Sequence, residues 1–588
     1  MKKVIEILQE ELSAAFEKAG YDKKYAKVGV SNRPDLCQYQ CNGALAAAKE
    51  YHKAPIQMAN EVVEFLKDSE SFKEIAAQAP GFINMSVSDR FLADYINKMA
   101  ASETLGLDKA ENPETIVIDY GGANVAKPLH VGHLRSAVIG ESIKRTARYL
   151  GHKVIGDVHL GDWGLQIGLI ITELKHRKPE LVYFDESFDG EYPTEPPFTM
   201  SDLEEIYPYA SGYSKEHPEY KEEAQTATAK LQSGRKGYLA LWQHIINVSV
   251  ADLKKIYTKL NVEFDLWKKE SDAQPYIPQM VQDMKDGGYA HIDQGALVVD
   301  VKEETDTKEI PPCMILKSNG ATLYNTTDLA TIVERRRLFD PDEIIYVVDK
   351  RQSLYFEQVF RCARKTKIIG EDVKLEFVGF GTMNGKDGKP FKTRDGGVLR
   401  LEKLLEDVNE QVLDKMKDRD MDKDMIDDAA AKISLAAIKY GDLSNQASKD
   451  YIFDVDRFTS FEGNTGPYIL YTIVRTKSLL AKVKAQNITV DEKSAIEPAD
   501  SKSETDVMLA LTKWSETVNA AFEEHAPHKI CQFVYELSDT FNKFYHENKI
   551  VTNENEKQRD SYIKLSALVG KVLETAIDLL GLEAPERM

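Results

Sequence analysis

The residues TIVIDYGG at 115–122 constrain the fold of this chain more than any other run. Their β-branched side chains and the closing pair of glycines predict a buried strand. A helical pattern follows from about Gly132 to Leu150, and the run KVIGDVH at 153–159 predicts the next strand. A strand, a glycine-containing turn, a helix and a second strand begin a doubly wound parallel sheet of the kind that binds nucleotides. We therefore predict an α/β fold for the middle of the chain.

Strand patterns return further along the chain, after an acidic, Pro- and Tyr-rich insertion at about 175–245. We expect this insertion to be irregular. The parallel sheet is then predicted to resume at three apolar runs: GALVVDV at 295–301, PPCMILK at 311–317 and EIIYVVD at 343–349. The last of these runs is preceded by a charged helical pattern.

The chain has 588 residues, too many for one core, so we expect about three or four domains. From about residue 400 amphipathic helical patterns dominate, with a polar loop predicted at 486–505. The predicted divisions are an N-terminal α/β module, the sheet domain, a helical connector and an all-α C-terminal bundle, at 1–110, 111–400, 401–455 and 456–588.

Composition excludes several classes of protein. No run of ~20 apolar residues is present, so no membrane span is expected. The N-terminus lacks the pattern of an export signal, which predicts a cytoplasmic protein. A formal net charge of −20 argues against a sequence-independent binder of DNA or RNA, although local basic strips leave room for tRNA. The cysteines lack zinc-finger spacing, so neither structural zinc nor another metal site is expected at Cys37, Cys41, Cys313, Cys362 and Cys531.

The strongest chemical pattern is ANVAKPLHVGHLR at 123–135. His130 and His133 flank Gly132 at the start of the predicted helix, where free N–H groups and the helix dipole favour phosphate. Without a side chain, Gly132 lets an adenine ring approach the backbone, and both imidazoles could donate hydrogen bonds to phosphate oxygens. Two histidines at a helix start are also common as plain surface residues.

The whole string resembles the first signature of class I aminoacyl-tRNA synthetases, in the form found in arginyl-tRNA synthetases. Further similar segments extend the resemblance over essentially the entire chain: RPDLCQYQCNG at 33–43, GDWG at 161–164, FEGNTGPY at 461–468 and PERM at 585–588. This family resemblance implies a Rossmann-like catalytic domain, ATP with Mg²⁺, and transfer of L-arginine to tRNA(Arg) by a monomeric enzyme. It also implies that tRNA is needed for the first step.

The second class I signature corresponds to GKPFKTRDGGV at 388–398. Lys392 matches its first lysine, Arg394 or the displaced Asp395 stands where the second would fall, and Thr393 lies between them. The resemblance implies that Lys127 compensates for this departure. A mobile, lysine-rich surface loop is the plainer interpretation of the segment. The predicted ATP-binding residues are Gly132, His130, His133, Met383, Lys392, Thr393 and Arg394.

Arginine recognition requires a carboxylate that matches the guanidinium group. Tyr324 and Asp328 are four residues apart at the start of a predicted helix, so both could line one pocket. Asp328 could equally answer the helix dipole after a threonine cap. The resemblance adds other pocket residues: Asp119, Asn124, His133 and Gln352. His159 is expected either near the adenosine or tRNA end, or as a buried histidine.

For tRNA, the resemblance implies contacts at the outer corner from the first module and at the anticodon from the C-terminal helices. The candidates are Tyr39, Gln40, Asn42, Tyr468 and Tyr471, with Tyr545 and Trp514 as further aromatic rings that could stack on bases. Most aromatic residues on amphipathic helices are core residues instead. The alternatives to the main reading are another class I synthetase, an HxGH nucleotidyltransferase and a non-catalytic tRNA-binding paralogue.

Overall fold

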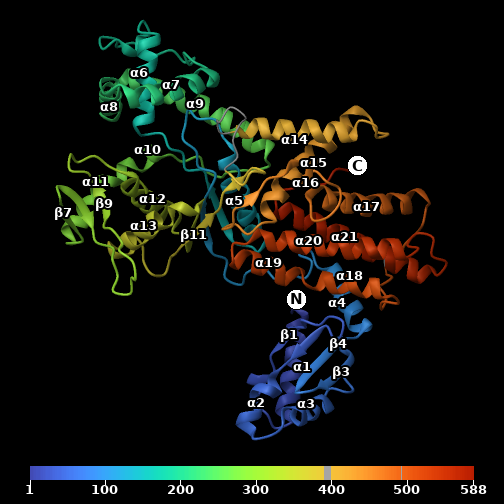
Figure 1. The fold of residues 1–588 in the computed structure, drawn as a ribbon. Helices are drawn as coiled ribbons and strands as arrows, with labels where there is room; N and C mark the ends of the chain where they lie inside the picture. The colour runs from blue at the N-terminus through green and yellow to red at the C-terminus, as the bar shows by residue number, and fades with distance from the viewer. Residues whose placement is uncertain (390–398, 492) are drawn as a thin grey trace.

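The computed structural model describes residues 1–389, 399–491 and 493–588. In Figure 1 a small N-terminal module projects from one side of a larger body, in which an α/β region adjoins a bundle of long helices. Among the helices of the described ranges, none combines the length and hydropathy needed to cross a membrane.

The N-terminal module is an antiparallel sheet covered by helices, as the α/β pattern predicted. Its strands lie in the order β1-β2-β4-β3. Its last helix packs against α18 of the C-terminal bundle. The elements are α1 (Val4–Lys18), β1 (Val28–Val30), β2 (Tyr39–Cys41), α2 (Gly43–Tyr51), α3 (Pro55–Glu64), β3 (Phe72–Gln78), β4 (Phe82–Val87) and α4 (Asp89–Ala101).

A four-stranded parallel sheet of order β11-β10-β5-β6 forms the centre of the α/β region. Because β6 and β10 lie on opposite sides of β5, the chain changes direction between β5 and β10, which is where doubly wound sheets open a crevice for ligands. The N-terminus of α5 faces that crevice. The elements are β5 (Thr115–Asp119), α5 (Val131–Tyr149), β6 (Lys153–Asp157), α12 (Tyr324–Phe339), β10 (Glu343–Asp349), η4 (Lys350–Gln352), α13 (Ser353–Lys365) and β11 (Lys374–Phe380).

Two of the predicted sheet strands belong elsewhere. The runs at 295–301 and 311–317 form β8 and β9, and β8 pairs antiparallel with both β7 and β9 in a separate three-stranded sheet. Only the run at 343–349 joins the parallel sheet, so the prediction that the sheet resumes at all three was wrong. The elements of this lobe are α10 (Glu270–Ala273), η3 (Gln274–Tyr276), α11 (Ile277–Asp286), β7 (Ala290–Asp293), β8 (Ala296–Val299) and β9 (Cys313–Leu316).

The insertion is helical, not irregular. Its helices form the separate lobe above the sheet in Figure 1. Apolar residues at helical spacing, such as Leu203, Ala210 and Ala224, are buried where α6, α7 and α8 pack together. The acidic residues of the segment lie mostly on the solvent-facing sides of these helices. The elements are α6 (Leu165–Arg177), η2 (Val182–Phe184), α7 (Met200–Glu216), α8 (Pro218–Gln232) and α9 (Lys236–Lys259).

The last part of the chain is a helical bundle, as predicted, with one short strand pair, β12–β13. The polar loop predicted at 486–505 overlaps the start of α18, because α17 ends at residue 485 and α18 begins at residue 502. The elements are β12 (Met383–Asn384), α14 (Leu401–Met416), α15 (Lys423–Leu443), β13 (Tyr451–Ile452), α16 (Val455–Phe458), α17 (Gly466–Ala485), α18 (Lys502–Thr512), α19 (Trp514–Glu523), α20 (Pro527–Glu547) and α21 (Glu556–Leu579).

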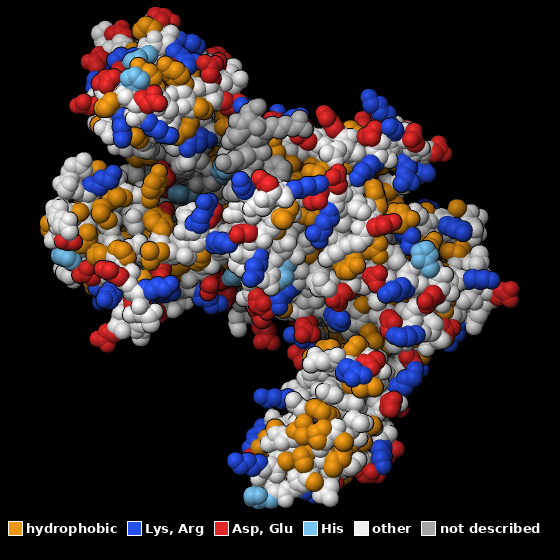
Figure 2. Space-filling view, in the orientation of Figure 1, with side chains coloured by type: hydrophobic (Ala, Val, Ile, Leu, Met, Phe, Trp, Pro, Cys, Tyr) orange, Lys and Arg blue, Asp and Glu red, His pale blue; other side chains and the backbone are white. Residues whose placement is uncertain are grey.

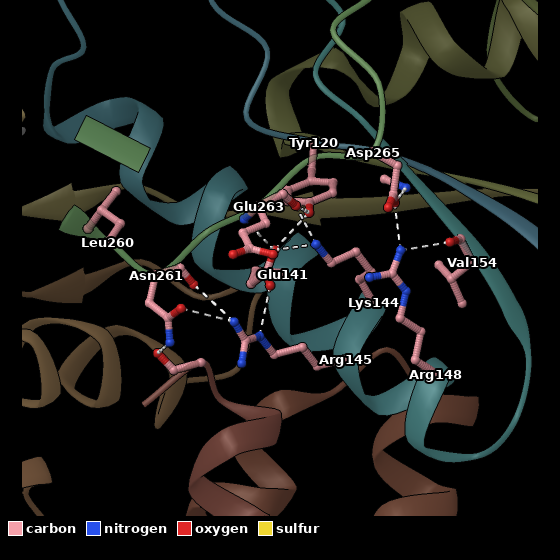
Figure 3. Close-up of polar contacts among 12 residues, drawn as sticks. Tyr120, Glu141, Lys144, Arg145, Arg148, Val154, Leu260, Asn261, Glu263 and Asp265 are labelled. Atoms are coloured by element: carbon pink, nitrogen blue, oxygen red, sulfur yellow. Dashed lines mark hydrogen bonds and ion pairs between the residues drawn. The ribbon is translucent and has the colours of Figure 1, made fainter. Parts of the chain in front are cut away.

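Polar contacts join α5 to the surrounding α/β region and to α21; Figure 3 shows those that centre on Glu141, Lys144 and Arg145. Glu141 accepts hydrogen bonds from the Tyr120 hydroxyl and from Arg145 Nε, both at 2.8 Å. Arg145 also donates to Asp578 at the end of α21 (2.8 Å) and to Asn261 Oδ1 (3.2 Å). The helix that begins at the first signature is therefore anchored both to the sheet and to the last helix of the chain.

Candidate active site

A cavity of about 940 Å³ opens at the carboxyl ends of β5 and β10. Figure 2 shows this face hollowed where the insertion lobe, the β7–β9 lobe and the body meet. Most of the predicted ATP and arginine residues line the cavity although they come from distant parts of the chain. They are Asp119, Asn124, His130, Gly132, His133, Tyr324, Asp328, Gln352 and Met383.

The two signature histidines stand together at the cavity wall, with ring centroids 3.9 Å apart. His130 Nδ1 accepts from the Gly132 N–H (3.0 Å), and His133 Nδ1 accepts from the His130 N–H (3.1 Å). Burial lowers the pKa of His133 to about 3, and burial together with Lys127 lowers the pKa of His130. Both rings are therefore neutral near pH 7 and carry their proton on Nε2, which makes each a hydrogen-bond donor.

The amides at the start of α5 are not free, contrary to the sequence-based expectation. The Val131 N–H donates to the Leu399 carbonyl (3.0 Å), the Gly132 N–H to His130, and the His133 N–H to the His130 carbonyl (2.8 Å). The imidazole Nε2–H groups and the helix dipole remain to attract phosphate. Gly132 is required for a local reason, since a Cβ there would lie 2.8 Å from His130 Cε1.

A pair of carboxylates occupies another part of the cavity. Asp328 accepts a hydrogen bond from the Tyr355 hydroxyl, and burial raises the pKa of Asp328. Burial and the charges of Asp162 and Asp328 raise the pKa of Glu270 to about 7. Glu270 was missed at the sequence level, because an acid in a four-residue helix carries no pattern. Among the described residues neither acid forms an ion pair, although Arg335 acts on Asp328 from further away, so a cation bound between the two acids would stabilise both.

The helix-dipole alternative for Asp328 is not favoured. Helix α12 begins at Tyr324 with Leu323 as its cap, and Thr326 Oγ1 accepts from the Leu323 N–H at 3.0 Å. Asp328 thus lies beyond the first turn, where the dipole is weak. The prediction of a threonine cap was also wrong, because Leu323 is the cap residue and Thr326 lies in the first turn of the helix.

Asp119 and His159 line the cavity in different ways. Arg335 donates to Asp119 (2.6 Å) and to Asp157 (2.8 Å) in a buried ion-pair triad. One Asp119 oxygen is therefore committed within the protein, and Arg335 itself was not foreseen from the sequence. His159 lies beside Asp328, with Nε2 3.5 Å from the Thr331 hydroxyl. It faces the cavity and is not a sealed core residue.

Of the two lysines predicted for catalysis, the structure describes Lys127 but not Lys392. Lys392, Thr393 and Arg394 lie outside the described residues. Lys127 does not line the cavity wall; its Nζ lies 4.6 Å from the ring centroid of Tyr207 on α7. Its charge nonetheless reaches both histidines, because it contributes to the lowered pKa of each.

The predicted tRNA contacts differ in exposure. Tyr39 is 8% exposed and its hydroxyl lies beside Thr512, which weakens the prediction of a direct tRNA contact there. Gln40 is half-buried and donates to Asn84 (2.8 Å), whereas Asn42 is exposed. These contacts stay predictions.

The aromatic residues predicted to contact tRNA from the C-terminal bundle also differ in exposure. Tyr471 is 40% exposed, and Arg475 lies over the rings of Tyr471 (4.9 Å) and Tyr545 (4.8 Å). Tyr468 is half-buried and accepts from Asn542 (3.0 Å). Trp514 is 1% exposed, so it is a core residue and the suggestion that it stacks on a base was wrong.

Metal ligands are not gathered anywhere in the described ranges. No group of three or more His, Cys, Asp or Glu side chains there is arranged to hold an ion. The five cysteines are buried free thiols. The cavity is lined by the hydrogen-bond donors of His130 and His133 in one part and by the carboxylates of Asp328 and Glu270 in another.

Comparison with known proteins agrees with this geometry. Three family descriptions match in order: "Arginyl tRNA synthetase N terminal domain" at 2–87, "tRNA synthetases class I (R), catalytic domain" at 95–455 and "DALR anticodon binding domain" at 469–588. Proteins named arginine–tRNA ligase are 60% identical in Agathobacter rectalis, over all of both chains, and 58% identical in Alkaliphilus oremlandii, over 99% of this chain and 100% of the relative.

A solved arginyl-tRNA synthetase structure from Plasmodium falciparum shares the fold over the full length of both chains, with a TM-score of 0.79 and 24% identity. The family match over the catalytic region, and the two relatives at 58–60% identity, extend beyond fold to membership. This chain belongs to the arginyl-tRNA synthetases, within class I of the tRNA synthetases.

Proposed function

We propose that this protein activates L-arginine with ATP and transfers it to the 3′-terminal adenosine of tRNA(Arg), releasing pyrophosphate and AMP. The observation that supports this best is the pairing of Asp328 with Glu270 in the cavity that also holds the signature histidines. Two neighbouring carboxylates that form no ion pair with another described residue match the charge and the donors of a guanidinium group.

The chemistry needs no protein nucleophile. An oxygen of the arginine carboxylate attacks the α-phosphorus of ATP, and pyrophosphate leaves. Neutral His130 and His133 donate from Nε2 to phosphate oxygens as charge develops there, and Lys127, Lys392, Thr393 and Arg394 add donors and positive charge. The 2′-hydroxyl of the terminal adenosine then attacks the acyl carbon, and AMP leaves.

The remaining substrate contacts complete the proposal. Asn124 meets the main-chain groups of arginine, Tyr324 and Gln352 border its pocket, and Met383 contacts the nucleotide. Mg²⁺ would be held mainly by the phosphates of ATP. We further propose a cytoplasmic monomer.

Two alternative functions would not require all of the side chains found in the cavity. Another class I synthetase would not require acids at both 270 and 328. A non-catalytic paralogue would not require the neutral histidine pair with its Nε2 donors aligned on the cavity.

The test is pyrophosphate exchange with ATP and each of the twenty amino acids, with and without total tRNA. We expect exchange with arginine alone, and only in the presence of tRNA. Exchange with a different amino acid would refute the pocket assignment but keep the class I chemistry. Silence with all twenty would refute the enzymatic proposal.

A further inference from the structure

Lys127 is held from two sides by the insertion. The preceding residue, Ala126, adopts a left-handed backbone (φ 61°) that is strained for a residue with a Cβ. The Ala126 N–H donates to the Ser249 hydroxyl on α9 at 2.8 Å, a buried hydrogen bond. The Lys127 ammonium lies 4.6 Å from the Tyr207 ring centroid on α7. Backbone and head group of this lysine are thus both directed by insertion helices.

The same face of α7 also contacts the other side of the signature region. Glu204, one turn before Tyr207, pairs with Arg400 at 2.7 Å. Arg400 lies in a short antiparallel bridge with His130, fixed by the Val131–Leu399 and Leu401–Leu129 backbone hydrogen bonds of 3.0 and 2.9 Å. Helix α7 therefore contacts both Lys127, which precedes the two histidines in the sequence, and the segment that runs beside His130.

A ring is a suitable partner for a lysine that must later bind phosphate. The aromatic face attracts the ammonium without accepting its N–H hydrogens as a carboxylate would, so the three donors stay available. Within the described ranges, Lys127 forms neither a hydrogen bond nor an ion pair. A carboxylate at the same place would neutralise the charge that the reaction needs.

We propose that Tyr207 is a positioning residue for Lys127, which holds the ammonium where its charge acts on His130 and His133 and leaves its N–H donors free for phosphate during adenylate formation. The insertion then contributes to the chemical step through this ring, and Ser249 contributes by holding the Ala126 backbone. The inference rests on the proposed function of the site.

The experiment compares Tyr207→Leu with Tyr207→Phe in arginine-dependent pyrophosphate exchange with tRNA present. Leucine fills the partly buried position but removes the aromatic face, so kcat should fall about tenfold with the KM for arginine unchanged. Phenylalanine keeps the face and should restore kcat to within about twofold. Tyr209→Leu, at an exposed tyrosine of the same helix, is the matched control and should match the wild type.

Repeating Tyr207→Leu in a Lys127→Met background isolates the coupling, since the loss of the ring should have no further effect once the ammonium is gone. Ser249→Ala should reproduce the Tyr207→Leu phenotype independently, which keeps the test valid if Tyr207→Leu does not fold. Effects that multiply in the double variant, or a Tyr207→Phe as slow as Tyr207→Leu, would overturn the proposal.

The wild-type control separates the two levels of inference. If wild-type protein exchanges pyrophosphate with arginine but Lys127→Met is as active, the positioning role is refuted and the proposed function stands. If the wild type does not exchange with arginine, both are refuted.

Discussion

Replacing Asp328 with asparagine should destroy arginine recognition while sparing the nucleotide half of the site. Asparagine has the shape of the aspartate and keeps an oxygen that can accept from Tyr355, so the local hydrogen bond need not be lost. The substitution removes only the negative charge that faces the cavity. Asp328→Asn is therefore a cleaner change than Asp328→Ala, which would also leave the tyrosine hydroxyl without its acceptor.

The size of the effect follows from the contacts that are lost. A hydrogen bond to a charged group contributes roughly 1.5–3 kcal/mol, and a guanidinium can make two to one carboxylate. Losing about 3 kcal/mol or more corresponds to at least ~100-fold weaker binding, at 1.4 kcal/mol per tenfold. Glu270 remains as a second carboxylate, so residual binding of arginine at high concentration is expected.

The assay is titration calorimetry of arginine and of ATP, together with the arginine KM in pyrophosphate exchange. Asp340→Asn, at the exposed end of the same helix, is the matched control, because asparagine tolerates the left-handed backbone there (φ 45°). ATP affinity should change by less than about twofold in both variants. Arginine affinity that survives Asp328→Asn within a few-fold would refute the pocket assignment.

Three further predictions concern the nucleotide side and stability. Gly132→Ala should lower kcat by about 100-fold in a folded protein, because the new Cβ collides with His130; near-normal kcat would contradict the close packing seen here. Because the pKa of His133 is about 3, His133→Gln should lower kcat without changing the shape of the pH–rate profile between about pH 5 and 8. Burial raises the pKa of Glu343 to about 7, so the stability that its protonated form contributes is present at about pH 4.5 and is lost as the pH rises through 7. Glu343→Gln should therefore raise the melting temperature at about pH 8 but not at about pH 4.5. An equal shift at both pH values would contradict this.

The parts of the fold that were predictable depend on local pattern. β5, α5 and β6 were placed within a few residues, because apolar periodicity and the glycine turn are properties of contiguous residues. The membership of β8 and β9 was not predictable in the same way. A strand's partners are set by long-range pairing, and an apolar run of four residues fits a parallel or an antiparallel sheet equally well.

The site shows the same division. The signature histidines, Tyr324 and Asp328 were placed because their motifs are contiguous, and the cavity unites them. Glu270 and Arg335 escaped prediction because only the folded chain brings them to Asp328 and Asp119. The hydrogen bond from the Val131 N–H to the Leu399 carbonyl was likewise invisible, since it depends on a segment more than two hundred residues away.

The contact between Arg145 and Asp578 spans 433 positions of the chain. During synthesis, the helix that begins at the histidines leaves the ribosome long before α21, which packs against it and carries Asp578. Domains generally fold in the order of their synthesis, but this helix must wait for its partner. A nascent chain therefore exposes this face of α5 to solvent until α21 has been made and packs against it.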